Sequence, residues 1–254
     1  MIVREDKKHF ICIEQDHHAH VAKKLITPWL EHYLRNDSLK QSVLYAIEQH
    51  DVGWNLFDKQ PLWNDKTKKP YTFIDLPLLI KTVLYTNGVN IVEQRNPYAA
   101  ALCSSHYTKF LGKYELEEVQ QYVKNEVLRR KAILHSFPEI DDEKFQYHLG
   151  FLQLADNMSL FICLHEAGNN DNRHRYFQKG IHIPEPVDLE KKNFIEATWK
   201  NEETLLFKNI KQVETFSITL KEKFVPKEKI EKVGLQEAHK ETPYKTRQIT
   251  IKCN

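Results

Sequence analysis

Residues 145–167, FQYHLGFLQLADNMSLFICLHEA, form the most apolar stretch of this chain and carry few charges. Apolar side chains fall on every side of a helix drawn through them, which is typical of a helix buried nearly all round. We therefore predict a central helix over about 141–166. Asp156 lies in the middle of it, and an ionised carboxylate there is costly unless it is paired, protonated or bound to a cation. Asp156 marks either a buried salt bridge, with Arg129 or Arg130 as partner, or a functional site.

Helical periodicity also precedes this stretch, whereas residues 55–75 are polar, aromatic and broken by two prolines. The aromatic loop at 54–73, with Trp54, Phe57, Trp63, Tyr71 and Phe73, could be a lid or substrate wall, or a long loop held in place by buried aromatic rings. A further helix is predicted from Asp16 until Pro28 and the following turn disturb it, and others over about 37–50, 76–94, 97–112 and 115–135.

Strand patterns lie at the two ends of the chain. Residues 1–14 alternate as a short β-hairpin does, and after about 180 the segments KNFIEATWKNEETLLFKNI, VETFSITLKEKFV and RQITIKC read as strands. The predicted fold class is therefore mainly α: a helical bundle over 15–178 with a small antiparallel β-rich subdomain over 179–254, whose sheet the N-terminal hairpin could join.

Composition excludes several classes of protein. With 254 residues, 41% hydrophobic and 28% charged, the chain is long enough for one large domain with a substantial core. Only 7 glycines are present, and neither GxGxxG nor GxxxxGK[ST] occurs, which argues against the common nucleotide-binding loops. A net charge of +2 gives no nucleic-acid signal. The oligomeric state cannot be read from these features.

The cysteines and the apolar runs bear on location. Cys12, Cys103, Cys163 and Cys253 are scattered singly, which is typical of reduced thiols and of neither a disulfide framework nor a CxxC zinc site. No run approaches 18 uninterrupted apolar residues, so we expect no membrane span. The start of the chain lacks the apolar region of a signal peptide. The sequence predicts a cytoplasmic protein.

Five metal-capable side chains stand on apolar helix faces. They come from four predicted helices, and each would face the core, where a single histidine is usually a hydrogen-bonded core residue. Three histidines near the start of the first helix, His17, His18 and His20, could be the first of these side chains. The helical spacing from the apolar residues that follow favours His17. The set is His17, the doublet His50 and Asp51, His106 and Asp156.

The order His…His-Asp…Asp on successive helices resembles the HD superfamily of metal-dependent phosphohydrolases. The spacing of His17 from Val21 and Ala22 also matches the H-x-x-x-V-A pattern at its first ligand. More closely, the chain resembles an uncharacterised bacterial family of HD-like proteins. That likeness rests on QDH at 15–17, HDVGW at 50–54, PYTFIDLP at 70–77, the segment from Asn96 to His106, and DNMSLFIC at 156–163.

The resemblance implies an HD-like helical domain with one divalent cation. Its metal ligands would be His17, His50, Asp51 and Asp156. Mixed nitrogen and oxygen ligation suits Mn, Fe, Ni, Co or Zn better than Mg or Ca. Asp51 would also orient a water, and His106 would act as a phosphate-contacting group, a general acid or a ligand for a second metal.

Two functions from different classes follow from these residues. One is a metal-dependent phosphohydrolase acting on a small phosphoester or a nucleotide. The other is a non-catalytic metal- or ligand-binding regulatory module, because Trp54 stands where many HD phosphohydrolases carry a lysine. An HD-like oxygenase with two irons would need more ligands than the sequence offers.

Overall fold

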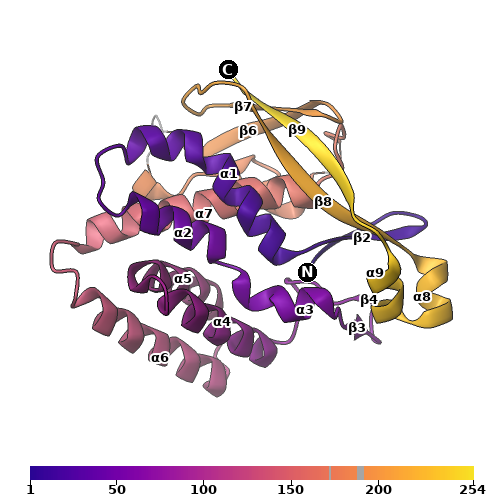
Figure 1. The fold of residues 1–254 in the computed structure, drawn as a ribbon, viewed down its shortest axis with the longest axis horizontal. Helices are drawn as coiled ribbons and strands as arrows, with labels where there is room; N and C mark the ends of the chain where they lie inside the picture. Colours follow the sequence, from indigo (N-terminus) through magenta and orange to yellow (C-terminus); the bar gives the residue numbers. More distant parts are fainter. Residues whose placement is uncertain (172, 188–191) are drawn as a thin grey trace.

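The computed structural model describes residues 1–171, 173–187 and 192–254, and it places helices and strands in two layers (Figure 1). The predicted helices are confirmed within a few residues. The longer helices are α1 Gln15–Tyr33, α2 Lys40–Gln49, α4 Leu78–Glu93, α5 Pro97–Leu111, α6 Glu117–Leu134 and α7 Asp142–Leu164. The short ones are α3 Asn55–Lys59, α8 Lys227–Val233, α9 Leu235–Glu241 and the 3-10 turns η1 Val52–Trp54, η2 Arg175–Phe177 and η3 Glu185–Val187.

Helix α7 is the centre of the fold, as its uniformly apolar sequence predicts. It begins at a capped turn, where the Asp141 side chain accepts a hydrogen bond from the Lys144 backbone N–H. It then packs against α1, α2 and α5 on one side and against strands β1 and β5 on the other. Asp156 lies on the side of α7 that faces these three helices, since its carboxylate contacts a histidine from each of them.

Helix α5 packs between α4 and α6 because its inward face is made of small residues. Asn96 caps its first turn by accepting a hydrogen bond from Ala99, and Pro97 occupies the first helical position, where no backbone donor is needed. The buried alanines at 99, 100 and 101 let the neighbouring helices approach closely. This packing carries His106 into the interior from the side opposite the sheet.

Two glycines allow the turn after the His-Asp doublet to contact α4. A Cβ built on Gly53 would lie 2.2 Å from the Leu84 carbonyl oxygen, and one built on Gly88 would lie 3.2 Å from the Gly53 backbone nitrogen. Only a residue without a side chain fits at Gly53. This contact fixes the position of Asp51, two residues earlier.

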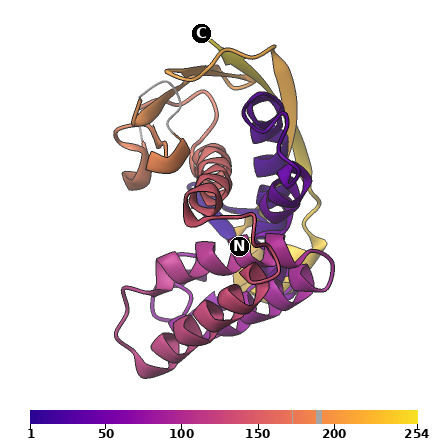
Figure 2. The same ribbon diagram turned by 90° about the vertical axis from the view of Figure 1, so that its left-hand side faces the viewer.

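The strands form one seven-stranded sheet that curls over α1 and α7 (Figure 2). Its order is β1-β2-β8-β9-β7-β6-β5, and all neighbours are antiparallel except β7 and β9, which are parallel. The strands are β1 Ile2–Glu5, β2 His9–Ile13, β5 Ile181–His182, β6 Phe194–Asn201, β7 Thr204–Lys208, β8 Phe216–Pro226 and β9 Lys245–Cys253, and β3 Trp63–Asn64 pairs separately with β4 Lys69–Pro70.

The prediction of a mainly α, HD-like bundle with a small antiparallel subdomain is wrong. Helices hold 52% of the residues and strands 19%, and the sheet is large, mixed and continuous with the helical layer. The N-terminal hairpin pairs with β8, and the segment after α7 adds β5, so strands from three parts of the chain build one sheet. For the same reason the description of the chain as all-α does not hold.

Within the described part of the chain, no helix combines the length and the apolar content needed to cross a bilayer. The four cysteines are free and buried, as predicted from their scattered positions.

Candidate metal centre

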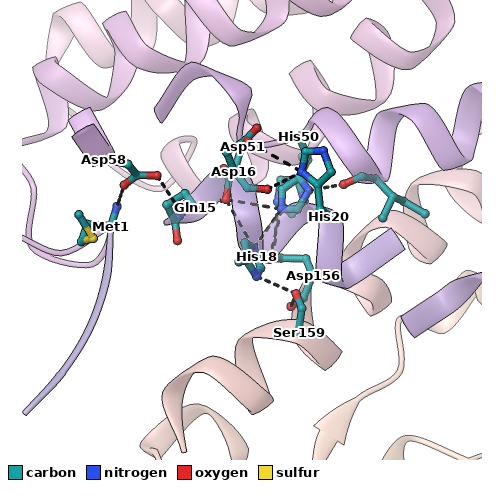
Figure 3. Close-up of polar contacts among 12 residues, drawn as sticks. Met1, Gln15, Asp16, His18, His20, His50, Asp51, Asp58, Asp156 and Ser159 are labelled. Carbon is teal, nitrogen blue, oxygen red and sulfur yellow. Dashed lines mark hydrogen bonds and ion pairs between the residues drawn. The ribbon is translucent and has the colours of Figure 1, made fainter. Parts of the chain in front are cut away.

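Four side chains from three helices and the turn before η1 converge at the heart of the molecule (Figure 3). His18 comes from α1, His50 ends α2, Asp51 precedes η1, and Asp156 comes from α7. Their exposed fractions are 0%, 1%, 6% and 6%. Two carboxylates and two imidazoles are thus withdrawn from water at one point.

The two imidazole Nε2 atoms are spaced from each other, and from one oxygen of each carboxylate, as ligands of an ion are. The Nε2 atoms of His18 and His50 lie 3.3 Å apart. Each also lies between 3.1 and 3.6 Å from Asp51 Oδ2 and Asp156 Oδ1. For metal–ligand bonds of about 2.0–2.2 Å, tetrahedral geometry puts neighbouring ligand atoms roughly 3.3–3.6 Å apart. The donor set of two imidazoles and two carboxylates fits a first-row transition ion.

Hydrogen bonds on the far side of each ring leave both Nε2 atoms free as ligands. His50 Nδ1 lies 2.7 Å from the Ile47 carbonyl oxygen, which can only accept. His18 Nδ1 lies 2.7 Å from the Ser159 hydroxyl, whose own proton is donated to the Asp156 carbonyl at 3.0 Å. Both Nδ1 atoms therefore carry the proton, and in each neutral ring Nε2 holds a lone pair. These two Nε2 atoms and the carboxylate oxygens of Asp51 and Asp156 are all hydrogen-bond acceptors. Acceptors repel one another at this distance unless a proton or a cation lies between them.

Protons can balance these charges, and a cation would displace them. Burial disfavours charge on His18, but hydrogen bonds to Asp156 and Asp51 outweigh it and raise the pKa of His18 well above its usual value. The same two carboxylates raise the pKa of His50. Although burial would raise the pKa of Asp156, hydrogen bonds from His18 and His50 lower it. The cluster could therefore hold a metal ion, with release of protons from the two rings.

His106 lies on the opposite side of Asp156. Its Nε2 is 3.5 Å from Asp156 Oδ2, and together with His50 and Asp156 it makes a second group of ligand atoms within 4.8 Å of one another. Burial lowers the pKa of His106 to about 4, although Asp156 draws it upward. Its Nδ1 is buried and has no hydrogen-bond partner among the described residues.

The structure places His17 outside the cluster. Its Nε2 accepts a hydrogen bond of 2.9 Å from the Lys221 backbone N–H in β8, so this ring contacts the sheet. Burial and the charge of Lys221 lower the pKa of His17 to about 4. The neighbouring residue His18 occupies the position that helical spacing assigned to His17, while His20 is exposed. The other predicted ligands and His106 do come together.

The alternative partners of Asp156 are bonded elsewhere. Arg129 pairs with Glu93 and Glu126, and Arg130 donates to the hydroxyls of Ser104 and Thr108. A salt bridge to arginine therefore does not explain the carboxylate in α7.

A cavity of about 610 Å³ opens onto the cluster. Asp51, His106, Asp156 and Gln15 line its inner end, and its walls include the stacked rings of Tyr85 and Tyr107, 4.0 Å apart. Three cationic side chains also line it: Lys81, Lys113 and Arg175. Lys81 is 8% exposed and donates from Nζ to the Ile74 carbonyl at 3.0 Å, and burial lowers its pKa. Cavities of this size and mixed lining are typical of small-molecule sites.

The aromatic loop contributes little to this cavity. Of its rings, Phe73 lines the cavity, whereas Trp54 is fully buried against Phe57 and Tyr85. Trp54 is therefore a core residue, and the cation that many HD proteins carry at this position could not be accommodated here without burying its charge.

No sequence pattern identifies the cations of the cavity, because Lys81, Lys113 and Arg175 reach the cavity from separate parts of the chain. In the sequence, Gln15 stands out only as part of QDH. Its contact with the doublet depends on the tertiary fold, in which its side chain donates a hydrogen bond of 3.0 Å to Asp51 Oδ2.

Comparison with known families gives a match over residues 1–227 to the family described as "Protein of unknown function (DUF3891)". The chain belongs to this family, which agrees with the predicted uncharacterised family and adds no link to the HD superfamily. No curated protein matches the chain. No solved structure matches it either.

Proposed function

We propose that this protein is a metal-dependent phosphohydrolase that acts on a small phosphoester, with nucleotides among the substrates to be tested. The observation that carries the proposal is a pair of overlapping groups of ligand atoms, His18–His50–Asp51 and His50–His106–Asp156, beside a cavity lined by cations and by Asp51, His106 and Asp156. The order of these residues along the chain supports it, because it is the order of metal ligands in the HD superfamily.

The charges of the cavity favour an anionic substrate. Its carboxylates, Asp51 and Asp156, belong to the proposed ligand set, and a divalent cation would neutralise them. Lys81, Lys113 and Arg175 then leave the rest of the lining positive. Many HD phosphohydrolases have a lysine at the position of Trp54. Here Lys81, from α4, supplies a cation to the cavity instead.

In the proposed reaction, a water oxygen forms a bond to phosphorus as the ester P–O bond breaks, and the water proton passes to the leaving oxygen. A divalent ion supplies Lewis acidity for this step, since it polarises a phosphoryl oxygen and lowers the pKa of a water. Asp51 orients the attacking water, His106 donates a hydrogen bond to the phosphoryl or leaving oxygen, and Lys81 neutralises the phosphate.

The test is a screen of the protein loaded with Mn²⁺, Co²⁺, Ni²⁺ or Mg²⁺ against p-nitrophenyl phosphate, bis-p-nitrophenyl phosphate and a nucleotide panel. We expect turnover that His50→Ala and Asp156→Ala each reduce by at least a hundredfold, because each removes a ligand atom. If the protein binds the ions but cleaves none of these esters, it is instead a non-catalytic metal- or ligand-binding module.

Lys81→Met is expected to raise KM for the best phosphoester about tenfold or more, equivalent to about 1.4 kcal/mol or more of lost binding. The change removes a buried ammonium that faces the cavity and keeps an unbranched side chain. Mn²⁺ affinity should stay within twofold of the unaltered protein. Lys109→Met, an exposed lysine of α5, is the matched control. Equal KM values for Lys81→Met and the control would contradict the role of Lys81.

A further inference from the structure

We propose that Gln15 is a positioning residue of the metal centre: its amide group holds Asp51 in the ligating orientation. This inference rests on the ligand set proposed above. It concerns a residue outside that set, on the first turn of α1.

Gln15 is held at both its backbone and its side chain (Figure 3). Its backbone N–H donates to Asp58 Oδ2 at 2.6 Å, and its side-chain Nε2 donates to Asp51 Oδ2 at 3.0 Å. Asp58 is itself 1% exposed, so the contact at the start of α1 is shielded from water. The first turn of α1 and the His-Asp doublet are thereby joined through one side chain.

The chemistry of the contact fixes which way the amide points. An ionised carboxylate has no proton to give, so Gln15 must turn its NH2 group toward Asp51 and its Oε1 away. The residue is 3% exposed and lines the cavity, and Oε1 has no hydrogen-bond partner among the described residues. A buried acceptor left unpaired costs about 1–3 kcal/mol.

The contact also acts on the ligand geometry. The oxygen that Gln15 holds, Asp51 Oδ2, is the one that lies 3.5 Å from His18 Nε2 and 3.6 Å from His50 Nε2. Without the amide, rotation about the Asp51 side chain could move this oxygen away from the two rings. Partners of this kind typically change metal affinity about 10–100-fold when removed.

Gln15→Met keeps the length and shape of the side chain and removes both the donor and the acceptor. Gln41→Met, on the exposed face of the first turn of α2, is the matched control. We would titrate each folded variant with Mn²⁺ by calorimetry and measure its melting temperature without metal. The expected result is a loss of Mn²⁺ affinity of about tenfold or more in Gln15→Met and less than twofold in Gln41→Met.

A residue that served only to start α1 would lower the melting temperature and leave the Mn²⁺ affinity of the folded protein unchanged. Equal affinity in Gln15→Met and the control overturns the proposal, whatever the melting temperatures. So does a wild-type protein that binds no Mn²⁺.

The same variant separates this inference from the proposed hydrolysis. With Mn²⁺ saturating, we expect kcat of Gln15→Met to fall about tenfold or more while KM changes less than threefold, because Asp51 is no longer held where it orients the attacking water. An unchanged kcat would overturn the claim that Gln15 positions Asp51 for the reaction. If the wild-type protein cleaves no ester, the proposed hydrolysis fails and the Mn²⁺ affinities alone decide for or against Gln15.

Discussion

Replacing His18 with alanine is expected to lower metal affinity by at least a hundredfold, whereas His17→Ala should leave it within threefold. His18 contributes one of four ligand atoms at the centre, while the ring of His17 accepts a hydrogen bond from the backbone of β8. Elemental analysis of each variant purified without chelators measures its metal content, and Mn²⁺ titration then measures its metal affinity.

The pair is its own control, because both variants remove an imidazole from α1. His17→Ala leaves the Lys221 N–H without its acceptor and should cost about 1 kcal/mol of unfolding free energy. Equal metal content in the two variants would remove His18 from the ligand set.

Gly53→Ala is expected to destabilise the fold by about 3 kcal/mol or more. The added Cβ would lie 2.2 Å from the Leu84 carbonyl oxygen, which belongs to the backbone of α4 and cannot rotate away. Either α4 or the turn after the doublet must shift, and overpacking of this kind typically costs about 1–3 kcal/mol, occasionally more. Urea unfolding of the metal-free protein measures this loss.

Val52→Ala, in the same turn, is the comparison, because it removes atoms from a half-buried side chain and adds none. We expect it to cost about 1 kcal/mol or less. If Gly53→Ala costs no more than Val52→Ala, the close contact between this turn and α4 does not constrain the doublet. A shift of the turn should also weaken Mn²⁺ binding, since Asp51 lies two residues away.

The helices could be predicted because each carries its own pattern of apolar residues, and α7 is the clearest case. The sheet could not, because its pairing depends on contacts between distant segments. The strand patterns of residues 1–14 and of the C-terminal third are visible, but nothing local tells that β9 inserts between β8 and β7 and so makes one pair parallel. The mistaken mainly α class follows from counting these strands as a small separate part.

At the candidate site, the same limit separates what could be predicted from what could not. Asp156 can be identified because a carboxylate in an apolar helix is costly unless it has a partner. The doublet can be identified because His50 and Asp51 are two adjacent metal-capable residues. His17 and His18 differ by only one step of about 100° around α1, so the choice between them depends on where β8 packs. In the structure β8 lies against His17, whose ring accepts a hydrogen bond from the strand. Gln15, Lys81 and Arg175 meet the site only through the tertiary fold.

The position of β9 has a consequence for the order in which the protein assembles during synthesis. This strand lies between β8 and β7, beyond the region that matches the family, and it is synthesised after both of them. Until residues 245–253 arrive, β8 and β7 each expose a row of unpaired backbone groups, and exposed edges of this kind favour pairing with other chains. Closure of the sheet is therefore a late, long-range step, during which the nascent chain is most open to aggregation and to chaperones.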